Sequence, residues 1–392
     1  MAEEPFGGGA PRLQIVEADD SHVASIAEFI RQIWTPSATA ESVAASRADA
    51  AASNIAEPGV APPTWIAIRA GQVLGYVTTI PVRWWDGRSD AGASWIKGLM
   101  VLPEFRNGPI GYAVMKAAAA QLPRSAGLAV ATPARRLFVA LGYTDLGAIP
   151  NWVRPIAPGR VLQHLDLHAL GLAGKKTWAA PALRLGQRTG IAGLAGWAGG
   201  VALRALAAAM RLSGRRFTAG PLPATASGDE LDPLWSRVRD GFPYSVVRDA
   251  RYLLSRYPAG ADSPYLWCDV RRDGRLCGIA VLRRPRVDGD PRLKGIRVAT
   301  LVDIVYPLDE PDAGLALLGA VERAARQVDA DAVLATASSP VLHALLRKQC
   351  FLPLQGNVHF LLRDSAADGS AFRGGLPNWW LTRGDGNSDD VF

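Results

Sequence analysis

The feature that most constrains the fold of this chain is a similarity between two of its own parts. Four short stretches near the start of the chain return in the same order in its last third, with comparable patterns of apolar residues. The matched pairs are GQVLGYVTT with GRLCGIAVL, IKGLMVLP with LVDIVYP, GLAVATP with AVLATAS, and RRLFVALGYTDLG with HALLRKQCFLPLQG. Such repetition indicates the duplication of one domain.

Each repeat alternates strand-like and helix-like stretches. Residues typical of strands flank Ala70-Gly71 in the first repeat and Asp273-Gly274 in the second, which predicts a hairpin in both. We therefore predict an α/β (α+β) fold of two tandem modules, each with a mixed, mostly antiparallel sheet flanked by helices. The predicted parts are a first module at 1–160, a linker at 161–228, a second module at 229–364 and a polar tail, partly ordered at best, at 365–392.

Cysteine usage limits the environment of the protein. The three cysteines, Cys268, Cys277 and Cys350, are an odd number and lack the spacing of a CxxC or Cys/His site. We therefore expect neither a disulfide framework nor structural zinc, and we predict a cytoplasmic location. The first residues are acidic and then glycine-rich, so they do not have the pattern of a secretory signal.

The net charge of +7 comes from one segment. Leu167–Gly228 contains no Asp or Glu but eight Lys and Arg residues, so the rest of the chain is close to neutral. Its longest uncharged apolar run, Ile191–Leu203, is shorter than the roughly 20 residues that span a bilayer. Beyond it, Arg204, Arg211 and Arg215 recur along a predicted helix, a pattern typical of peripheral contact with an anionic membrane. The alternative is a hydrophobic linker that packs on the protein and leaves its arginines in water.

One loop of the first module has the composition of a phosphate-binding turn. A strand-like stretch ends at Pro103, the loop RNGPIG follows, and then a helix begins. Glycines allow backbone N–H groups to approach a pyrophosphate, and the start of a helix is the positive end of its dipole. With the later strand, helix and "LGY", roughly residues 12–150 resemble the GNAT superfamily of N-acyltransferases. The chain departs from the family's Arg/Gln-x-x-Gly-x-Gly/Ala pattern at Pro109, which has no N–H to donate.

The resemblance implies that the first module binds an acyl-CoA, as acetyl-CoA or a long-chain acyl-CoA, and needs no metal. The strand before the loop would donate a backbone N–H to the thioester carbonyl, and an arginine would contact the pyrophosphate. The residues implied in this site are Leu99, Val101, Arg106, Asn107, Gly108, Ile110 and Gly111.

Catalysis in this family also requires groups that move protons. The usual acid is a tyrosine of the last helix, four residues before its glycine, and here that position is Phe138. Tyr143 follows the glycine instead and is a candidate acid, although an aromatic residue there is commonly part of the core.

Three other charged residues are candidate catalytic groups. Glu104, beside the loop, is the nearest carboxylate and a candidate base, but it also fits a solvated turn. Lys97 lies in an otherwise apolar strand, where it is either buried with a lowered pKa or exposed at an edge. Asp303 lies in an apolar strand of the second module, where a carboxylate is costly unless it is paired or used to hold an acceptor amine.

The second repeat resembles the same fold with less of its chemistry. Where phosphate contacts would lie, it carries Asp309, Glu310 and Asp312, and three carboxylates repel a pyrophosphate. We therefore expect a degenerate module that binds the acceptor or is structural. Tandem modules of this kind are similar to Fem-type aminoacyltransferases and to acyltransferases of bacterial envelope polysaccharide and lipid pathways, in which the stretch DARYLLSRYP has counterparts.

These patterns predict an acyl-CoA-dependent N-acyltransferase. Its acceptor would be an amine on an envelope amphiphile, such as an amino sugar or a sphingoid-like base, and the enzyme would lie in the cytoplasm or peripherally on the inner face of the membrane. Pro109 and Phe138 favour an alternative, a non-catalytic GNAT-fold protein that binds a ligand or partner. Use of aminoacyl-tRNA is a third option, but the nearly neutral modules offer little basic surface, so we expect no nucleic-acid partner.

Overall fold

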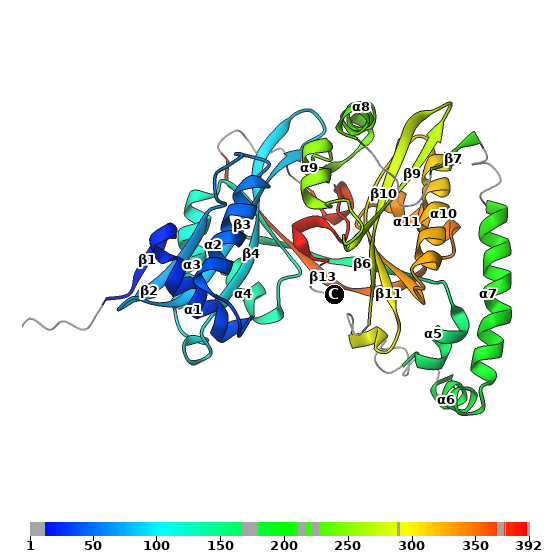
Figure 1. Ribbon diagram of the computed structural model, residues 1–392, viewed down its shortest axis with the longest axis horizontal. Coiled ribbons are helices and arrows are strands. Elements are labelled where there is room, and N and C mark those ends of the chain that lie inside the picture. Colours follow the sequence, from blue (N-terminus) through cyan, green and yellow to red (C-terminus); the bar gives the residue numbers. More distant parts are fainter. Residues whose placement is uncertain are drawn as a thin grey trace, which may run out of the picture. The chain divides into compact units, whose positions relative to one another are not determined.

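A computed structural model describes residues 12–166, 179–210, 216–220, 227–287, 291–366, 372 and 374–389 (Figure 1). The chain divides into two compact units, and neither is one continuous stretch. Unit 1 consists of Met1–Arg83, Gly92–Asp145 and Leu361–Ser370, and unit 2 consists of Trp84–Ala91, Leu146–Phe360 and Ala371–Phe392.

Unit 1 contains the strand order β1-β2-β3-β4-β5. β1 to β3 pair antiparallel, and β5 is parallel to β4. Its helices and strands are β1 (Gln14–Glu17), α1 (Val23–Ile33), α2 (Ala40–Ala52), β2 (Thr64–Arg69), β3 (Gln72–Trp85), β4 (Asp90–Val101), α3 (Ile110–Gln121), β5 (Arg124–Leu128) and α4 (Thr132–Ala140), with short 3₁₀ turns at Asp20–His22 and Pro103–Phe105.

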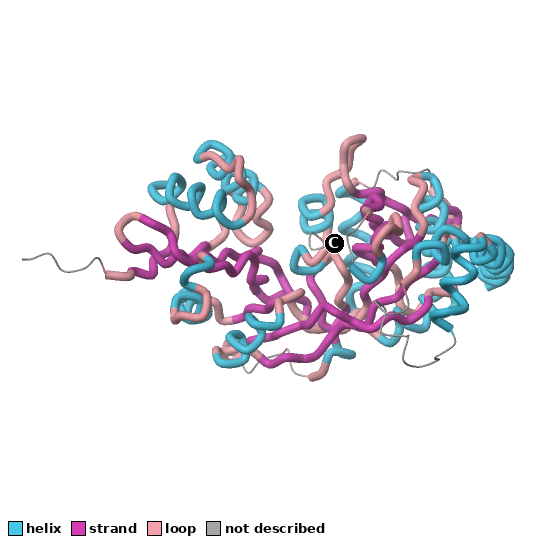
Figure 2. Tube along the Cα trace, turned by 90° about the horizontal axis from the view of Figure 1, so that it is seen from below, coloured by secondary structure: helices cyan, strands magenta, loops and turns pink. Residues whose placement is uncertain are grey.

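Neighbouring residues of β3 show how helices cover both faces of this sheet (Figure 2). A Cβ atom at Gly75 would lie 2.6 Å from Ile110 of α3, so close packing of α3 requires glycine there. Tyr76 points to the other face because side chains alternate along a strand, and its ring stacks on Phe29 of α1 at 6.0 Å between centroids. α1 and α3 therefore lie on opposite faces, and their apolar residues belong to the core of unit 1.

Unit 2 has the strand order β13-β6-β12-β11-β10-β9-β7. All of the recorded pairs from β6 to β7 are antiparallel except β11 with β12, which is parallel. Its elements are β6 (Thr144–Pro155), α5 (Pro158–His164), α6 (Ala179–Thr189), α7 (Ile191–Met210), β7 (Thr218–Ala219), α8 (Gly228–Val238), β8 (Tyr244–Val246), α9 (Ala250–Arg256), β9 (Tyr265–Arg272), β10 (Arg275–Arg286), β11 (Val298–Val305), α10 (Pro311–Gln327), β12 (Ala332–Thr336), α11 (Pro340–Lys348), β13 (Leu352–Asp364) and β14 (Trp379–Trp380).

The two repeats fold alike, which confirms the predicted fold class. The order β2-β3-β4-α3-β5-α4 in the first repeat returns as β9-β10-β11-α10-β12-α11 in the second. Both hairpins turn on two residues with positive φ, Ala70 and Gly71 at 50° and 79°, and Asp273 and Gly274 at 53° and 78°. Two such residues in succession are the signature of a type I′ turn, which matches the twist of the strands it joins.

The strands that follow the last helix of each repeat are divided between the units. β6 begins at Thr144 in unit 1, but it pairs with β12 of unit 2. β13 begins in unit 2, and its residues from Leu361 onward belong to unit 1, where Leu361 is in the core. Arg363 secures this end of the strand because its guanidinium donates to the carbonyls of Ala119 and Leu122 at 2.8 and 3.0 Å.

The C-terminal segment is buried in unit 2 from Trp379 to Asp385. Trp379 and Trp380 are fully buried, and they pair as β14 with β8. The ring of Trp379 contacts those of Trp84 and Phe360 at 5.3 and 5.0 Å between centroids. The prediction that this tail is at best partly ordered is therefore wrong for these residues.

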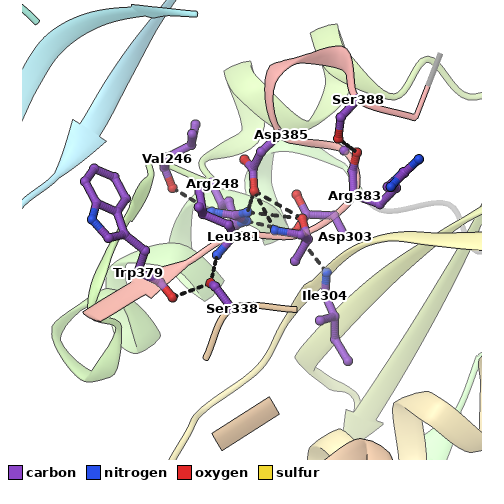
Figure 3. A network of polar contacts seen from close by, with 12 residues as sticks. Val246, Arg248, Asp303, Ile304, Ser338, Trp379, Leu381, Arg383, Asp385 and Ser388 are labelled. Carbon is purple, nitrogen blue, oxygen red and sulfur yellow. Dashed lines mark hydrogen bonds and ion pairs between the residues drawn. The ribbon is translucent and has the colours of Figure 1, made fainter. Parts of the chain in front are cut away.

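A buried ion-pair network fixes the tail to β11 (Figure 3). Arg248 donates from Nε to Asp303 at 2.8 Å and from Nη2 to Asp385 at 2.9 Å, and all three side chains have no exposed surface. Burial by itself would lower the pKa of Arg248, but the two carboxylates raise it above its ordinary value. Backbone N–H groups also donate to these carboxylates, that of Ile304 to Asp303 at 2.9 Å and that of Thr382 to Asp385 at 2.8 Å.

The stretch DARYLLSRYP forms α9 and also holds the tail. Asp249 caps the helix by accepting a hydrogen bond from the N–H of Tyr252 at 2.9 Å. Arg256, at the other end of α9, donates to the carbonyl of Gly384 at 3.1 Å and pairs with the carboxylate of Asp389. The motif therefore stabilises the packing of the C-terminal segment on unit 2.

Gly384 is the tightest point of this packing, and we expect Gly384→Ala to destabilise the protein by about 1–3 kcal/mol. A Cβ atom there would lie 2.0 Å from Oη of Tyr257 and 2.8 Å from the carbonyl oxygen of Val302, which is backbone and cannot rotate away. Thermal unfolding measures the effect. Gly241→Ala is the control, since a Cβ atom there meets nothing within 4 Å, and equal melting temperatures of the two variants would contradict the prediction.

Candidate functional site

The last part of β4 is irregular where a GNAT enzyme would hold a thioester. β4 pairs with β5 at Ser94, Trp95 and Ile96, and β4 then continues as far as Val101. Gly98 has a φ of 64°, a conformation that costs other residues energy in a strand. Leu99 and Val101, both half-buried, follow this bend, so the backbone changes direction immediately before the loop.

The loop after β4 is exposed from Glu104 to Pro109 except for the half-buried Phe105. Arg106 donates from Nε to the carbonyl of Val101 at 3.2 Å, so its side chain lies back along the end of the strand. The N–H of Gly108 donates to carbonyls of the loop itself, those of Phe105 at 3.3 Å and of Arg106. The loop is thus folded on its own backbone, and Asn107 and Gly108 are both exposed.

The start of α3 supplies backbone donors beside this loop. Pro109 is the N-cap and has no side chain that can accept from the first amides. The first intrahelical bond runs from the N–H of Ala113 to the carbonyl of Pro109 at 2.9 Å, so the N–H groups of Ile110, Gly111 and Tyr112 precede the helical ladder. The proline removes one donor and leaves these three at the positive end of the helix dipole.

The two charged candidates of unit 1 are on the surface. Glu104 lies in the 3₁₀ turn Pro103–Phe105 and is exposed. Lys97 is also exposed, although the residues before it in β4 are buried, so it has the second of the two placements that the sequence allowed.

Tyr143 lies in the core of unit 1. It is 2% exposed, its hydroxyl is 2.7 Å from Oγ of Ser125, and its ring packs edge-on against Phe138 at 4.8 Å between centroids. Burial raises its pKa, so the phenol stays protonated. This environment is that of a satisfied core tyrosine.

Asp303 belongs to unit 2 and lies in the ion-pair network of Figure 3. Besides Arg248, its carboxylate accepts from Oη of Tyr257 at 3.2 Å and from the N–H of Ile304. The cost of a carboxylate in this apolar strand is therefore offset by pairing, the first of the two explanations that the sequence left open.

The second loop of the duplicated pair already has cationic partners. Glu310, the N-cap of α10, accepts from Arg272 at 2.8 Å, and Arg216 lies 3.7 Å from Glu310 and 3.9 Å from Asp312. The start of α10 corresponds to the start of α3, where a pyrophosphate would bind in the first repeat. In the second repeat ion pairs lie at this position, which favours a role for this module other than binding of coenzyme A.

Sequence reasoning missed a pocket of about 320 Å³ between α1, α2 and β3 in unit 1. Its apolar wall is formed by Ile26, Ile30, Val43 and the ring of Tyr76, and its polar wall by Thr35, Ser37, Ser42, Ser46 and Arg47. Tyr76 also lies beside the bend of β4, since a Cβ atom at Gly98 would be 3.6 Å from its ring. The pocket wall and the bend therefore share one residue.

Tyr76 carries a phenol hydroxyl at the wall of the pocket. It is half-buried, and burial raises its pKa, against which hydrogen bonds with Thr78 and Thr64 and the charge of Arg47 act in the lowering direction. With the pKa above its ordinary value, the hydroxyl is protonated at neutral pH. The alternation of a strand predicts that Tyr76 and Gly75 face opposite sides of the sheet. The helices that pack against Tyr76 cannot be predicted in this way, because they depend on tertiary structure.

Residues 26–143 match the model of the Acetyltransferase (GNAT) family, and this match supports acyl transfer as the general class of reaction. No curated protein matches the sequence.

Solved structures extend the likeness of fold to both units. A GCN5-related N-acetyltransferase from Anabaena variabilis is 12% identical with a TM-score of 0.53, covering 91% of this chain and 73% of that one. One from Kribbella flavida is 14% identical with a TM-score of 0.50, covering 90% and 71%. N-myristoyltransferase of Saccharomyces cerevisiae, with bound myristoyl-CoA, is 11% identical with a TM-score of 0.50, covering 93% and 85%. At these identities the likeness shows the fold.

Proposed function

We propose that the protein transfers an acyl group from an acyl-CoA to an amine. The observation that carries this proposal is the arrangement in unit 1 of a bent strand, an exposed loop and an uncapped helix start within a GNAT domain. Three N–H groups at residues 110–112 and the guanidinium of Arg106 are suited to the anionic pyrophosphate of coenzyme A. Gly111 leaves room at the helix start, where a Cβ atom would lie 3.4 Å from Val101 and 3.9 Å from Leu137.

The chemistry needs a polarised carbonyl, a deprotonated amine and a leaving thiolate. Backbone N–H groups near Leu99 and Val101 would stabilise the negative charge that develops on the thioester oxygen. As the nitrogen–carbon bond forms, the carbon–sulfur bond breaks, the amine loses a proton and the sulfur can accept one. We assign the proton donor to Tyr76, since Phe138 cannot fill the family's tyrosine position and Tyr143 is enclosed in the core.

The pocket supports an amphiphilic acceptor. Its apolar wall suits an alkyl chain, and its hydroxyl-rich wall suits the hydroxyls of an amino sugar or an amino alcohol. A solved protein of the same fold binds myristoyl-CoA, which makes a fatty acyl donor as reasonable as acetyl. We therefore propose an acceptor of the envelope-amphiphile class.

Calorimetric titration with acetyl-CoA and palmitoyl-CoA tests the donor site. We expect micromolar binding of one of them, about tenfold or more weaker in Arg106→Ala because a charge-assisted hydrogen bond is lost. Gly111→Trp, with its ring forced toward Val101 and Leu137, should abolish binding. Arg88→Ala removes another exposed arginine of the chain and is the matched control.

The alternative is a GNAT-fold protein that binds a ligand without catalysis. Two observations favour it: Pro109 has no N–H, and the N–H of Gly108 is already used by loop carbonyls. Failure of both thioesters to bind to the wild-type protein would overturn the acyltransferase proposal and leave this alternative.

A further inference from the structure

Helix α7 (Ile191–Met210) presents an apolar surface that no described residue covers. Among the described residues it is the one helix long and apolar enough to cross a membrane by length and composition, with a mean hydropathy of 1.4. The helix is thus longer than the uncharged run recognised in the sequence, and length alone does not exclude a span. The packing of α7 decides whether it can span a bilayer or lies along its surface.

One side of α7 is held on unit 2 by small residues. Gly196 approaches the backbone of Gly159 at the start of α5 so closely that a Cβ atom would lie 2.6 Å from the Gly159 Cα. Gly200, one turn further, faces Pro158, where a Cβ atom would lie 3.1 Å from the proline ring. A helix fixed to a neighbour along one face cannot cross a bilayer without leaving it, so α7 is suited to lie along a surface.

The opposite side of α7 is apolar and exposed. Leu194 is 72% exposed and Trp197 is 67% exposed. Ile191 and Val201, on the same side of the helix, are 61% and 43% exposed. Other exposed large apolar side chains of these two helices are Leu185 of α6, and Leu206 and Met210 of α7. A row of large apolar side chains exposed along one side of a helix is unusual on a protein surrounded only by water.

The charged residues of this segment indicate which kind of partner the apolar surface would bind. Arg184, Arg188 and Arg204 are exposed beside it, and Leu167–Gly228 contains no carboxylate. Two copies of this surface packed on each other by a twofold axis would place arginines against arginines. An anionic lipid surface complements both the arginines and the apolar side chains, because the former contact headgroups while the latter enter the acyl boundary. Arg211 and Arg215, predicted to belong to the same stripe, lie outside the described residues.

We propose that α6 and α7 form a docking surface for an anionic lipid bilayer, with α7 lying in the plane of the interface. The argument uses unit 2 alone, so it does not depend on acyl transfer, and lipid binding can fail or succeed independently of thioester binding.

Vesicle flotation of the full chain tests the proposal. We expect the protein to float with vesicles of phosphatidylglycerol and phosphatidylcholine (3:7), but not with phosphatidylcholine alone. The triple change Arg184→Glu, Arg188→Glu and Arg204→Glu should weaken binding roughly a hundredfold or more, since each cation near the surface contributes about a factor of five. Leu194→Glu, Trp197→Glu and Val201→Glu together should also abolish flotation.

The matched control places three glutamates elsewhere on unit 2, as Val287→Glu, Val341→Glu and Leu352→Glu, at positions that are also exposed. If the control lost flotation as fully as the α7 variant, or if the wild type floated with neither vesicle, the proposal would be wrong. If the wild type were a dimer that did not float with vesicles, and the α7 variant were a monomer, the surface would be assigned to contact with a second copy instead.

A conservative variant guards against loss of folding. In vesicles that contain brominated lipid, Trp197 should be quenched, and Trp197→Phe should remove that part of the signal from the 12 tryptophans. Equal quenching of both proteins would mean that this side chain does not enter the bilayer and would overturn the proposal.

Discussion

Asp303→Ala should destabilise the protein by about 3–5 kcal/mol, because it leaves Arg248 buried with one carboxylate where it now has two. For a unit of this size the melting temperature should fall by about 10 °C. Thermal unfolding followed by circular dichroism measures the change, and the same samples can be assayed for thioester binding to unit 1.

Asp309→Ala is the control for this substitution. Asp309 is an exposed carboxylate of the loop before α10, so its removal should change the free energy of unfolding by no more than about 0.5 kcal/mol. An Asp303→Ala protein that melts like the wild type but has lost acyl transfer would show that Asp303 holds the acceptor amine, as the sequence first suggested.

Tyr76→Phe should lower kcat by about 10²- to 10⁴-fold if its hydroxyl donates the proton to the leaving thiolate. The affinity for the thioester should stay the same because the ring, and with it the wall beside Gly98, is retained. Steady-state kinetics with the donor that binds best provides the measurement.

Tyr143→Phe distinguishes Tyr143 from Tyr76 as the proton donor. It removes one buried hydrogen bond to Ser125, so a cost of about 1 kcal/mol in stability is expected with kcat unchanged. Ser46→Trp, on the exposed polar wall of the pocket, should raise KM for the acceptor. If the Tyr76→Phe protein were active and the Tyr143→Phe protein inactive, Tyr143 would be the proton donor and Tyr76 would not.

Much of the fold could be predicted from local sequence patterns. The hairpins at Ala70-Gly71 and Asp273-Gly274, the order of elements in both repeats and the loop before α3 all follow from short-range physics, namely turn chemistry, apolar periodicity and helix starts. The match of residues 26–143 to the GNAT family agrees with the loop pattern despite Pro109.

Long-range pairing could not be predicted in the same way. A carboxylate such as Asp303 is costly in any apolar strand. Its partner Arg248 lies 55 positions away, and Asp385, the second carboxylate paired with Arg248, lies 82 positions from Asp303, so no local pattern connects them. The tail seemed polar because its two tryptophans stand among glycines and aspartates, and those aspartates are the groups that pair with buried arginines. Tyr76 was missed as a candidate because the pocket that it lines is formed with α1 and α2.

The division of β13 has a consequence for the order in which the chain is synthesised. On the ribosome, residues 12–145 emerge long before Leu361, a core residue of unit 1 that lies in β13 and follows the strands β6 to β12 of unit 2. The edge of β5 that pairs with β13 therefore stays unpaired until nearly the whole polypeptide has been made. A gene truncated after residue 360 should accordingly impair the N-terminal unit, and a gene cut between the two repeats should give two fragments that each lack a strand.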